Sequence, residues 1–311
     1  MLKKILLLTA ALLITALFLV VPAWPGTLPA SIIPDGTAWV AHLDMEKFVA
    51  TKLYEVLEKE GHLQVRSHKI SRMMKIDLFK DITGLTIFGL GPGEKRVVFA
   101  AAGRFNKERL LSFLDLDEDH REIPYAGKTI YSTDENGYGV FINDGLIVFA
   151  ERRDDIERVL DTAADKAKNF VSSKLYAAFK DISAGAFVSG IINDLAGLGH
   201  EIRQSKLIEK ASGLFFTARE RQDNFELRLQ VSAASPERAK DMADIAQGII
   251  AMARLGQGKE GPRAERIISL LQGLRIKLEG KTVGLEFDVP SRELIELISY
   301  SHDHGFGEFL D

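Results

Sequence analysis

Apolar and polar residues alternate along several short segments of this chain, and this period of two constrains the fold more than any other feature. Between residues 225 and 231 the apolar positions are Phe225, Leu227, Leu229 and Val231. Residues 274–279 and 285–289 repeat the pattern. A strand with one apolar and one polar side is typical of an antiparallel sheet that buries one face, so the sequence predicts such a sheet.

Amphipathic segments with helical spacing lie between the strands. Apolar residues recur every three or four positions over residues 49–57, 236–255 and 294–298. A longer helical stretch over residues 154–180 is expected to break near Asn169. Together these segments predict the α+β class, in which amphipathic helices pack against a mainly antiparallel sheet.

Three short segments have the residues of tight turns between strands. Asn136–Gly137 and Asp144–Gly145 are pairs that readily adopt the positive φ of hairpin turns. Residues 279–281 resemble a third turn. We therefore expect hairpins at all three places.

Two further segments are apolar throughout instead of alternating. They comprise residues 97–100 and 146–149. A strand that is apolar on both sides is typical of a position covered on both faces. The sequence therefore predicts that both strands are central or covered on both sides.

Two similar series of strands and helices follow each other along the chain. Residues 38–44 and 186–192 each form a short apolar strand before a helical segment. The offset from Gly84 to Gly213, which begin apolar strands, equals the offset between two helix N-caps, Asn106 and Ser235. Equal offsets indicate an internal duplication. We therefore predict two related halves, each a mainly antiparallel sheet packed with amphipathic helices.

The first residues have the features of an export signal. Lys3 and Lys4 precede an apolar run at residues 5–21, and cleavage is expected after the small residue Ala23. The alternative is an uncleaved membrane anchor over residues 5–24, because a spanning helix needs about 20 apolar residues. Both interpretations place the folded part outside the cytoplasm, either periplasmic or secreted, or anchored to the cytoplasmic membrane.

The chain is accordingly divided into five parts. The prediction is a signal peptide or N-terminal membrane anchor at 1–23, a stalk at 24–34, a first α+β repeat at 35–168, a second α+β repeat at 169–300 and a flexible tail at 301–311. The proline-rich composition of residues 24–34 suggests the stalk, and the glycine-rich end of the chain suggests the tail.

Composition excludes several kinds of chemistry. The chain has 311 residues, a formal net charge of −4 and no cysteine. The lack of cysteine excludes disulfides, thiolate nucleophiles, thiolate metal sites and an acylated lipoprotein cysteine. A mildly acidic chain also lacks the basic stripe that nucleic acids require, so no nucleic-acid partner is expected.

Short motifs that resemble functional sites have a simpler structural explanation. Gly-Lys-Thr occurs at 127–129 and 280–282, but the second glycine of a phosphate-binding loop is missing and strands follow. Each motif is therefore predicted to be a turn into a strand. The acidic run 115–119 lacks the glycine and glutamate of a calcium loop. His302-Asp303-His304 lies in the tail, but a metal site needs three or four ligands and a second shell, which a flexible terminus is not expected to hold in place. We predict no catalytic, cofactor-binding or metal-binding residues, and no cofactor.

One local basic patch remains as a candidate contact surface. It consists of Arg66, Lys69, Arg72 and Lys75. The simpler interpretation is the solvated face of a helix. The functional interpretation is contact with anionic lipid headgroups or with an acidic partner.

The opening of the folded region resembles that of many uncharacterised exported bacterial proteins. The resemblance is carried by residues 33–44, Ile-Pro-Asp-Gly-Thr-Ala-Trp-Val-Ala-His-Leu-Asp, and by the strand-turn-strand-helix segment 274–297. These motifs are structural. The resemblance implies a bacterial envelope setting and no particular activity.

Three hypotheses about function follow from these observations. The first is a non-catalytic extracytoplasmic binding or interaction protein, whose partner is an unknown protein or envelope component, with membrane contact through the N-terminal segment if it stays uncleaved. The second is a carrier of an apolar ligand or lipid in a cavity between sheet and helices. The third is an envelope hydrolase, which would need Asp, His and Ser side chains to converge in one cleft.

Overall fold

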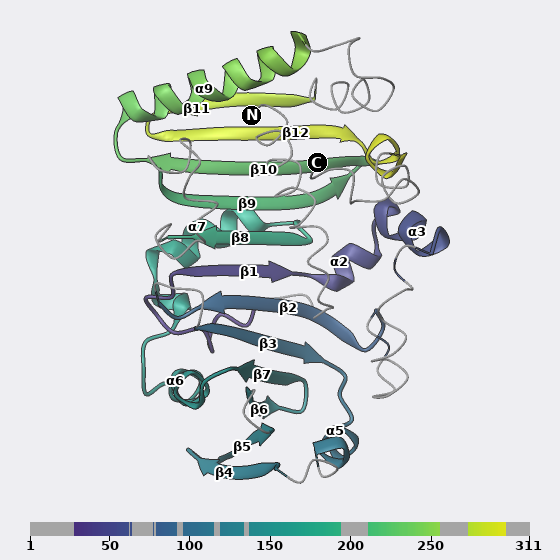
Figure 1. Ribbon diagram of the computed structural model, residues 1–311, viewed down its shortest axis with the longest axis vertical. Coiled ribbons are helices and arrows are strands. Elements are labelled where there is room, and N and C mark those ends of the chain that lie inside the picture. Colours follow the sequence, from purple (N-terminus) through teal and green to yellow (C-terminus); the bar gives the residue numbers. More distant parts are fainter. Residues whose placement is uncertain are drawn as a thin grey trace.

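The computed structural model describes residues 28–61, 63, 77, 79–91, 96–114, 119–133, 137–193, 211–255 and 273–296. Within these residues twelve strands form one sheet in which all neighbouring strands are antiparallel (Figure 1). The strands are β1 Trp39–Leu43, β2 Ile82–Gly89, β3 Val97–Gly103, β4 Arg121–Tyr125, β5 Lys128–Thr133, β6 Gly137–Asn143, β7 Leu146–Ala150, β8 Val188–Ile192, β9 Ala211–Arg221, β10 Asn224–Ala233, β11 Leu274–Glu279 and β12 Thr282–Pro290.

Several helices accompany the sheet. They are α2 Met45–Val49, α3 Lys52–Lys59, α5 Lys107–Leu114, α6 Arg153–Ala163, the 3-10 helix η2 Phe170–Ser172, α7 Lys174–Ser183 and α9 Pro236–Leu255. Residues 291–296 are also helical. The predicted mixture of helices with a mainly antiparallel sheet is therefore confirmed. The expected break in the helical stretch 154–180 is also present, because residues 164–173 separate α6 from α7.

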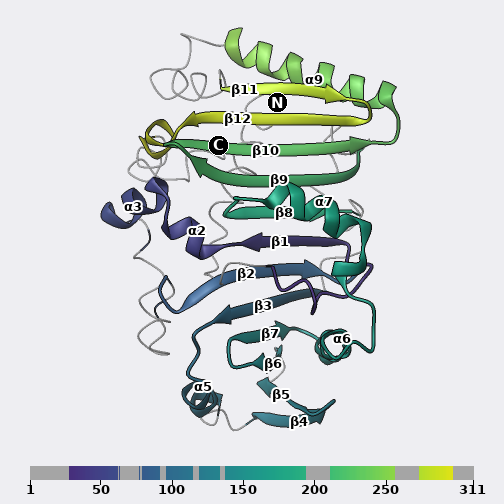
Figure 2. The same cartoon turned by 180° about the vertical axis from the view of Figure 1, so that it is seen from behind.

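The strands lie in the order β11-β12-β10-β9-β8-β1-β2-β3-β7-β6-β5-β4, seen from behind in Figure 2. The central pair of strands is β1 and β8. Outward from this pair, the strands on one side follow the order β1-β2-β3-β7-β6, and those on the other side follow the matching order β8-β9-β10-β12-β11. A helix follows both β3 and β10 along the chain. The structure joins the two predicted sheets into one. That the halves are related stays a prediction, which superposition of the two sets of strands would test.

The sheet has two faces, which we name after the helices that cover them. Cross-strand partners point to the same face. Val40 is paired with Ile191, and Ile191 with Phe215, so all three share the face that we call the α6 face. Phe215 is paired with Gln230, so the next residue, Val231, lies on the opposite face, which we call the α9 face.

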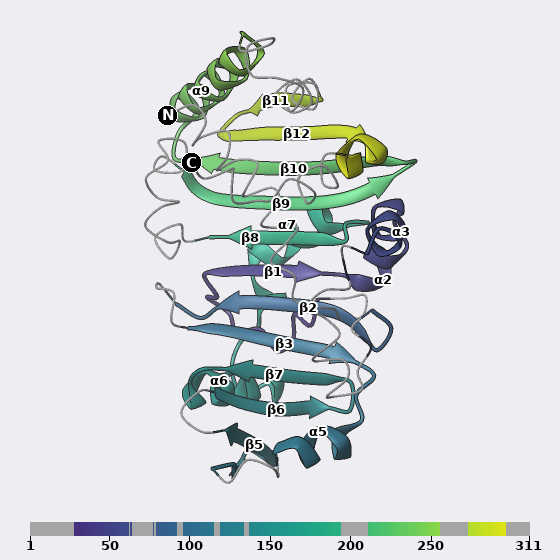
Figure 3. The same cartoon turned by 45° about the vertical axis from the view of Figure 1, so that its right-hand side comes forward.

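The two halves are covered mainly on different faces, although α7 packs on the α6 face of β8 and β9 in the second half. Around β1 to β7, the core contains Phe88, Val98 and Val148 of the α6 face, packed with Ile156 and Val159 of α6. In the other half, the core lies on the α9 face. It joins Leu214, Val231 and Val283 to Ala239, Met242 and Ala243 of α9. Figure 3 shows α9 at the end of the molecule opposite to α5 and β5.

The two fully apolar strand segments, in β3 and β7, lie inside the sheet with neighbours on both sides, as one of the two predicted alternatives has it, but they are not covered on both faces. Val98 and Val148 are fully buried on the α6 face, but Phe99 is 38% exposed and Phe149 is 47% exposed. These two phenylalanines are cross-strand partners on the α9 face. Helix α6 packs on the other face, and Phe99 and Phe149 stay partly exposed, so the apolar composition of these strands does not reflect burial on both sides.

The turns follow the prediction only in part. Gly280 has a φ of +58° in the predicted third hairpin. At Asp144–Gly145 a turn forms, but neither residue has a positive φ, and the Asn143 side chain instead accepts a hydrogen bond from the Gly145 N–H. Asn136 lies outside the described residues. Both central residues have a positive φ at Ala126–Gly127, where the sequence predicts a turn into a strand, and at Gln222–Asp223, where it predicts none.

The N-terminal segment ahead of β1 packs against the core. Ala30, Ile32 and Ile33 are buried, and the Phe170 N–H donates to the Ile33 carbonyl. The described end of the predicted stalk, residues 28–34, is therefore part of the folded unit. Residues 1–27 and 297–311, which include the predicted leader and tail, lie outside the described residues. Among the helices that the structure does describe, none has the length and apolar character needed to span a bilayer.

Candidate functional site

The basic patch predicted from the sequence falls outside the part of the chain that the structure describes. Arg66, Lys69, Arg72 and Lys75 all lie within residues 64–76. Their role as a contact surface remains a prediction. The candidate sites described below consist of residues outside this patch.

Metal binding has no support in the described ranges. No group of three or more His, Asp and Glu side chains lies there in a position to share an ion. Residues 115–118 of the acidic run and both tail histidines are outside these ranges.

A row of buried polar side chains crosses the centre of the sheet on the α6 face. His42 is paired with Thr86 of β2 on one side and Ser189 of β8 on the other, and Ser189 is paired with Thr217 of β9. All four residues are buried. His42 Nδ1 and Thr86 Oγ1 are hydrogen-bonded at 3.0 Å, while His42 Nε2 has no partner among the described residues. Sequence-distant His and Ser residues therefore do meet, but in the interior.

The electrostatics of this row of side chains disfavour general acid–base catalysis by His42. Burial lowers the pKa of His42 to about 4, although Asp44 acts in the opposite direction. Asp44 itself caps α2, where its Oδ1 accepts from the Lys47 N–H at 3.0 Å and its Oδ2 lies 2.5 Å from Lys47 Nζ. A neutral imidazole without solvent access cannot exchange protons with a substrate. The row is best explained as internal polar packing between the halves.

Among the hollows on the described surface, two are candidate sites, and neither is a deep pocket. One, of about 270 Å³, lies where α2 meets α3 and is lined by Thr51, Lys52, Tyr54 and Glu58 among others. Tyr54 donates to Glu58 there at 3.1 Å, and burial raises its pKa to about 12. The Tyr54 hydroxyl therefore stays protonated at physiological pH. The hollow is wide open, whereas ligand pockets enclose most of their ligand.

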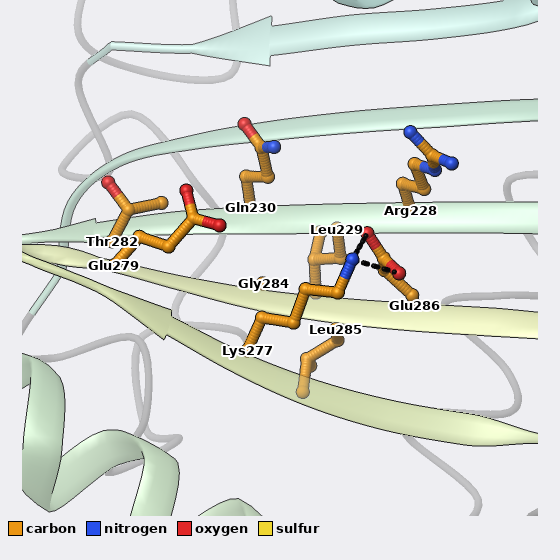
Figure 4. Close-up of a pocket in the computed structure, with 9 residues that line it drawn as sticks. All are labelled: Arg228, Leu229, Gln230, Lys277, Glu279, Thr282, Gly284, Leu285 and Glu286. Carbon is orange, nitrogen blue, oxygen red and sulfur yellow. Dashed lines mark hydrogen bonds and ion pairs between the residues drawn. The ribbon is translucent and has the colours of Figure 1, made fainter.

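The second hollow has a volume of about 70 Å³ and lies on the α6 face of the β10–β12–β11 region (Figure 4). Gly284 lies between Gln230 and Lys277 in the strand register, and its missing side chain leaves the space. The Lys277 ammonium points at Glu286, with Nζ at 3.0 Å from Oε1 and 2.9 Å from Oε2. This ion pair lowers the pKa of Glu286. The space suffices for about two water molecules.

Further ion pairs extend over this region. Arg219 lies 2.5 Å from Glu226, and Arg275 lies 3.1 Å from Asp288. Glu226, Asp288 and Glu286 therefore each already have a basic partner in the described part of this surface. Paired charges on one face and leucines on the other account for the alternation seen in the sequence.

The α9 face of the first half carries an open aromatic surface. We use this name for Trp39, Phe99, Tyr131, Phe141 and Phe149. Phe99 and Phe149 are exposed, and the other three are half-buried. Tyr131 and Phe141 meet edge to face at a centroid distance of 6.2 Å, and Lys107 of α5 lies 5.4 Å from the Phe141 centroid.

Glycines opposite the aromatic residues let the rings lie against the sheet. Gly139 is the cross-strand partner of Phe149, and a Cβ at Gly139 would lie 3.1 Å from the Phe149 ring. Gly89 is the partner of Trp39, and a Cβ there would lie 2.2 Å from the indole. Flattened rings over glycine present a broad apolar area to solvent instead of a packed ridge.

The sequence contained the signal for this surface, but it was open to two interpretations. Phe99 and Phe149 each lie in a run of apolar residues, which is equally typical of complete burial. The cross-strand glycines, Gly89 and Gly139, would have distinguished the two cases only with knowledge of the strand pairing.

Comparisons with known proteins assign no function to this chain. No model of a protein family matches the chain, and no curated protein matches it. Among solved structures, crystal forms III, I and IV of TP0453 resemble it with TM-scores of 0.49, 0.47 and 0.49. Their sequences are 12%, 13% and 11% identical, over 88% of this chain and 99%, 98% and 97% of TP0453. Similarity of this degree is too low to transfer a function.

Proposed function

We propose that the protein is a non-catalytic binding or interaction protein that works outside the cytoplasm, and that the open aromatic surface is where it contacts its partner. The observation that carries the proposal is the exposed cross-strand pair of Phe99 and Phe149. Large exposed apolar side chains that adjoin one another are typical of interaction sites. The export signal expected at residues 1–23 supports the extracytoplasmic setting.

Binding is favoured over the two other functions considered. The His and Ser side chains that meet, His42 and Ser189, are buried away from any substrate, which disfavours a hydrolase built on them. A lipid carrier requires an enclosed cavity of about 300 Å³ or more, while the two described hollows are open or small. Both observations hold whether or not the N-terminal segment is cleaved.

The shared strand order also supports a duplication of the chain. Both halves place five strands in the same relative order outward from β1 and β8. We infer a common origin, after which the halves diverged. An open apolar face in one half and an ion-paired face in the other are consistent with one half having kept or gained a binding role.

Photo-crosslinking in intact cells of the native host tests the proposed surface. The full-length chain would carry a photoreactive phenylalanine analogue at Phe149. Val171, which is also 47% exposed but lies in η2, is the matched control position. We expect a discrete adduct with one envelope component at Phe149 and none at Val171. Equal or absent adducts at the two positions would contradict the proposal.

A further inference from the structure

The two ends of the sheet differ in how their edges are protected. β4 and β11 are the terminal strands of the sheet as described, and each leaves one row of backbone groups without a neighbouring strand. Such an edge readily pairs with another chain unless proline, charge or a cover prevents it. The two edges differ in which backbone N–H and C=O groups they direct outward.

The β4 edge lacks a donor where one would be needed. The two-residue turn Ala126–Gly127 makes Tyr125 and Lys128 a hydrogen-bonded pair, so every second residue of β4 from Tyr125 bonds to β5. The residues between them, Glu122 and Pro124, face outward. Pro124 has no N–H, so this edge is a poor template for another strand.

Among the described residues the β11 edge carries no proline, its charges Arg275, Lys277 and Glu279 are of both signs, and α9 packs on one face of the strand. The Asp288 N–H donates to the Gly273 carbonyl at 3.3 Å, which assigns Gly273 and every second residue after it to bonding with β12. Leu274, Ile276 and Leu278 therefore direct their N–H and C=O groups outward. The edge is also accessible, because Arg275, Lys277, Leu278 and Glu279 are all exposed, Leu278 to 45%.

The side chains of β11 complement a second copy of the same strand. We infer that two copies of this chain join by antiparallel pairing of their β11 edges, with Lys277 on the two-fold axis. This register sets Arg275 opposite the second copy's Glu279, and Ile276 opposite its Leu278, each twice by symmetry. Opposite charges and apolar pairs directly across a ladder are both stabilising. The outward-facing backbone groups of Ile276 and Leu278 then bond to each other.

Neighbouring registers are less favourable. With Ile276 on the axis, Arg275 faces Lys277 of the second copy. With Leu278 on the axis, Arg275 faces Lys281 and Ile276 faces the turn residue Gly280. In the chosen register the one like-charge contact is between the two Lys277 side chains, and each of these is already paired with its own Glu286. The resulting dimer is closed and isologous, and it leaves the open aromatic surface free.

Single cysteines test the register directly, because the natural chain has none. In the proposed dimer the two Lys277 Cα atoms form a non-hydrogen-bonded pair about 4.5 Å apart, within the range that a disulfide spans. The full-length chain carrying Lys277→Cys should form a disulfide-linked dimer under mild oxidation. Arg275→Cys should not, but a mixture of Arg275→Cys and Glu279→Cys chains should crosslink. Met252→Cys on α9, where Met252 is 48% exposed, controls for random collision.

Charge reversal gives a second measurement that does not depend on oxidation. Arg275→Glu should weaken dimerisation about tenfold or more, measured by analytical ultracentrifugation, because it places two carboxylate pairs across the interface. Adding Glu279→Arg should restore it. A monomeric natural chain, a crosslinking maximum at another position of β11, or crosslinking no stronger than at Met252→Cys would overturn the inference. Circular dichroism of each variant separates lost dimerisation from lost folding.

Discussion

In the first half of the sheet, α6 packs on one face, and in the second half α9 packs on the other. The free face differs accordingly. In the second half it carries ion pairs such as Lys277–Glu286 and Arg219–Glu226. In the first half it carries Phe99 and Phe149. The same strand order therefore supports two surfaces of opposite character, because the helices decide which face each half can leave to water.

The difference teaches that an uncovered face need not be polar. The second half conforms to the ordinary division between a buried apolar and a solvated polar face. The first half has apolar residues on both faces of β3 and β7, of which only one is covered by helices. The exposure of Phe99 and Phe149 is thus not explained by burial in the described part of the chain, and it is the feature that the proposed binding role would explain.

The largest expected effect comes from comparing phenylalanines on the two faces of the first half. Phe88→Ala removes a fully buried ring from the α6 face and should lower the free energy of unfolding by about 3–5 kcal/mol. Phe149→Ala should cost about 1 kcal/mol or less, because half of its ring is already in water. Urea unfolding of both variants measures the difference. Similar losses would mean that Phe149 is a core residue and that the two faces are not distinct.

A smaller effect is expected at the boundary between the halves. The pKa of His42 is about 4 in the folded protein and 6.5 in an unfolded chain, so the unfolded chain binds the proton first as the pH falls. Stability from this residue is complete above pH 6.5 and is lost as the pH falls towards 4, by about 3 kcal/mol. Urea unfolding at pH 7 and pH 4.5 measures the loss.

His42→Gln is the control for this measurement. It keeps a polar group near Thr86 but cannot titrate, so the variant should lose less stability on acidification than the natural chain. An equal loss in both proteins would assign the acid sensitivity to other groups.

The smallest expected effect concerns the two turns in which both central residues have a positive φ, Ala126–Gly127 in the first half and Gln222–Asp223 in the second. Ala126 and Gln222 have φ values of +49° and +50°, which asparagine tolerates better than either residue. Ala126→Asn and Gln222→Asn should each raise the free energy of unfolding by about 0.5 kcal/mol. Thermal melts detect such a gain. Asp144→Asn, at a turn without positive φ, should bring none, and a similar gain there would remove the backbone explanation.

Local patterns in the sequence were sufficient for much of the fold. Alternation correctly predicted β10, β11 and β12, and Gly280 correctly predicted the turn between the last two. The turn at Gln222–Asp223 was missed, because glutamine carries no local preference for a positive φ. The candidate site could not be predicted, because the exposure of Phe99 and Phe149 depends on where α6 packs.

By itself, the sequence determined that strands and amphipathic helices form, since both follow from the spacing of apolar residues along a few turns or pleats. Only the tertiary structure decided which face of each half the helices cover and which strands remain at the edges. Those outcomes depend on the register between strands far apart in the chain, such as β1 with β8, and no local spacing contains that information.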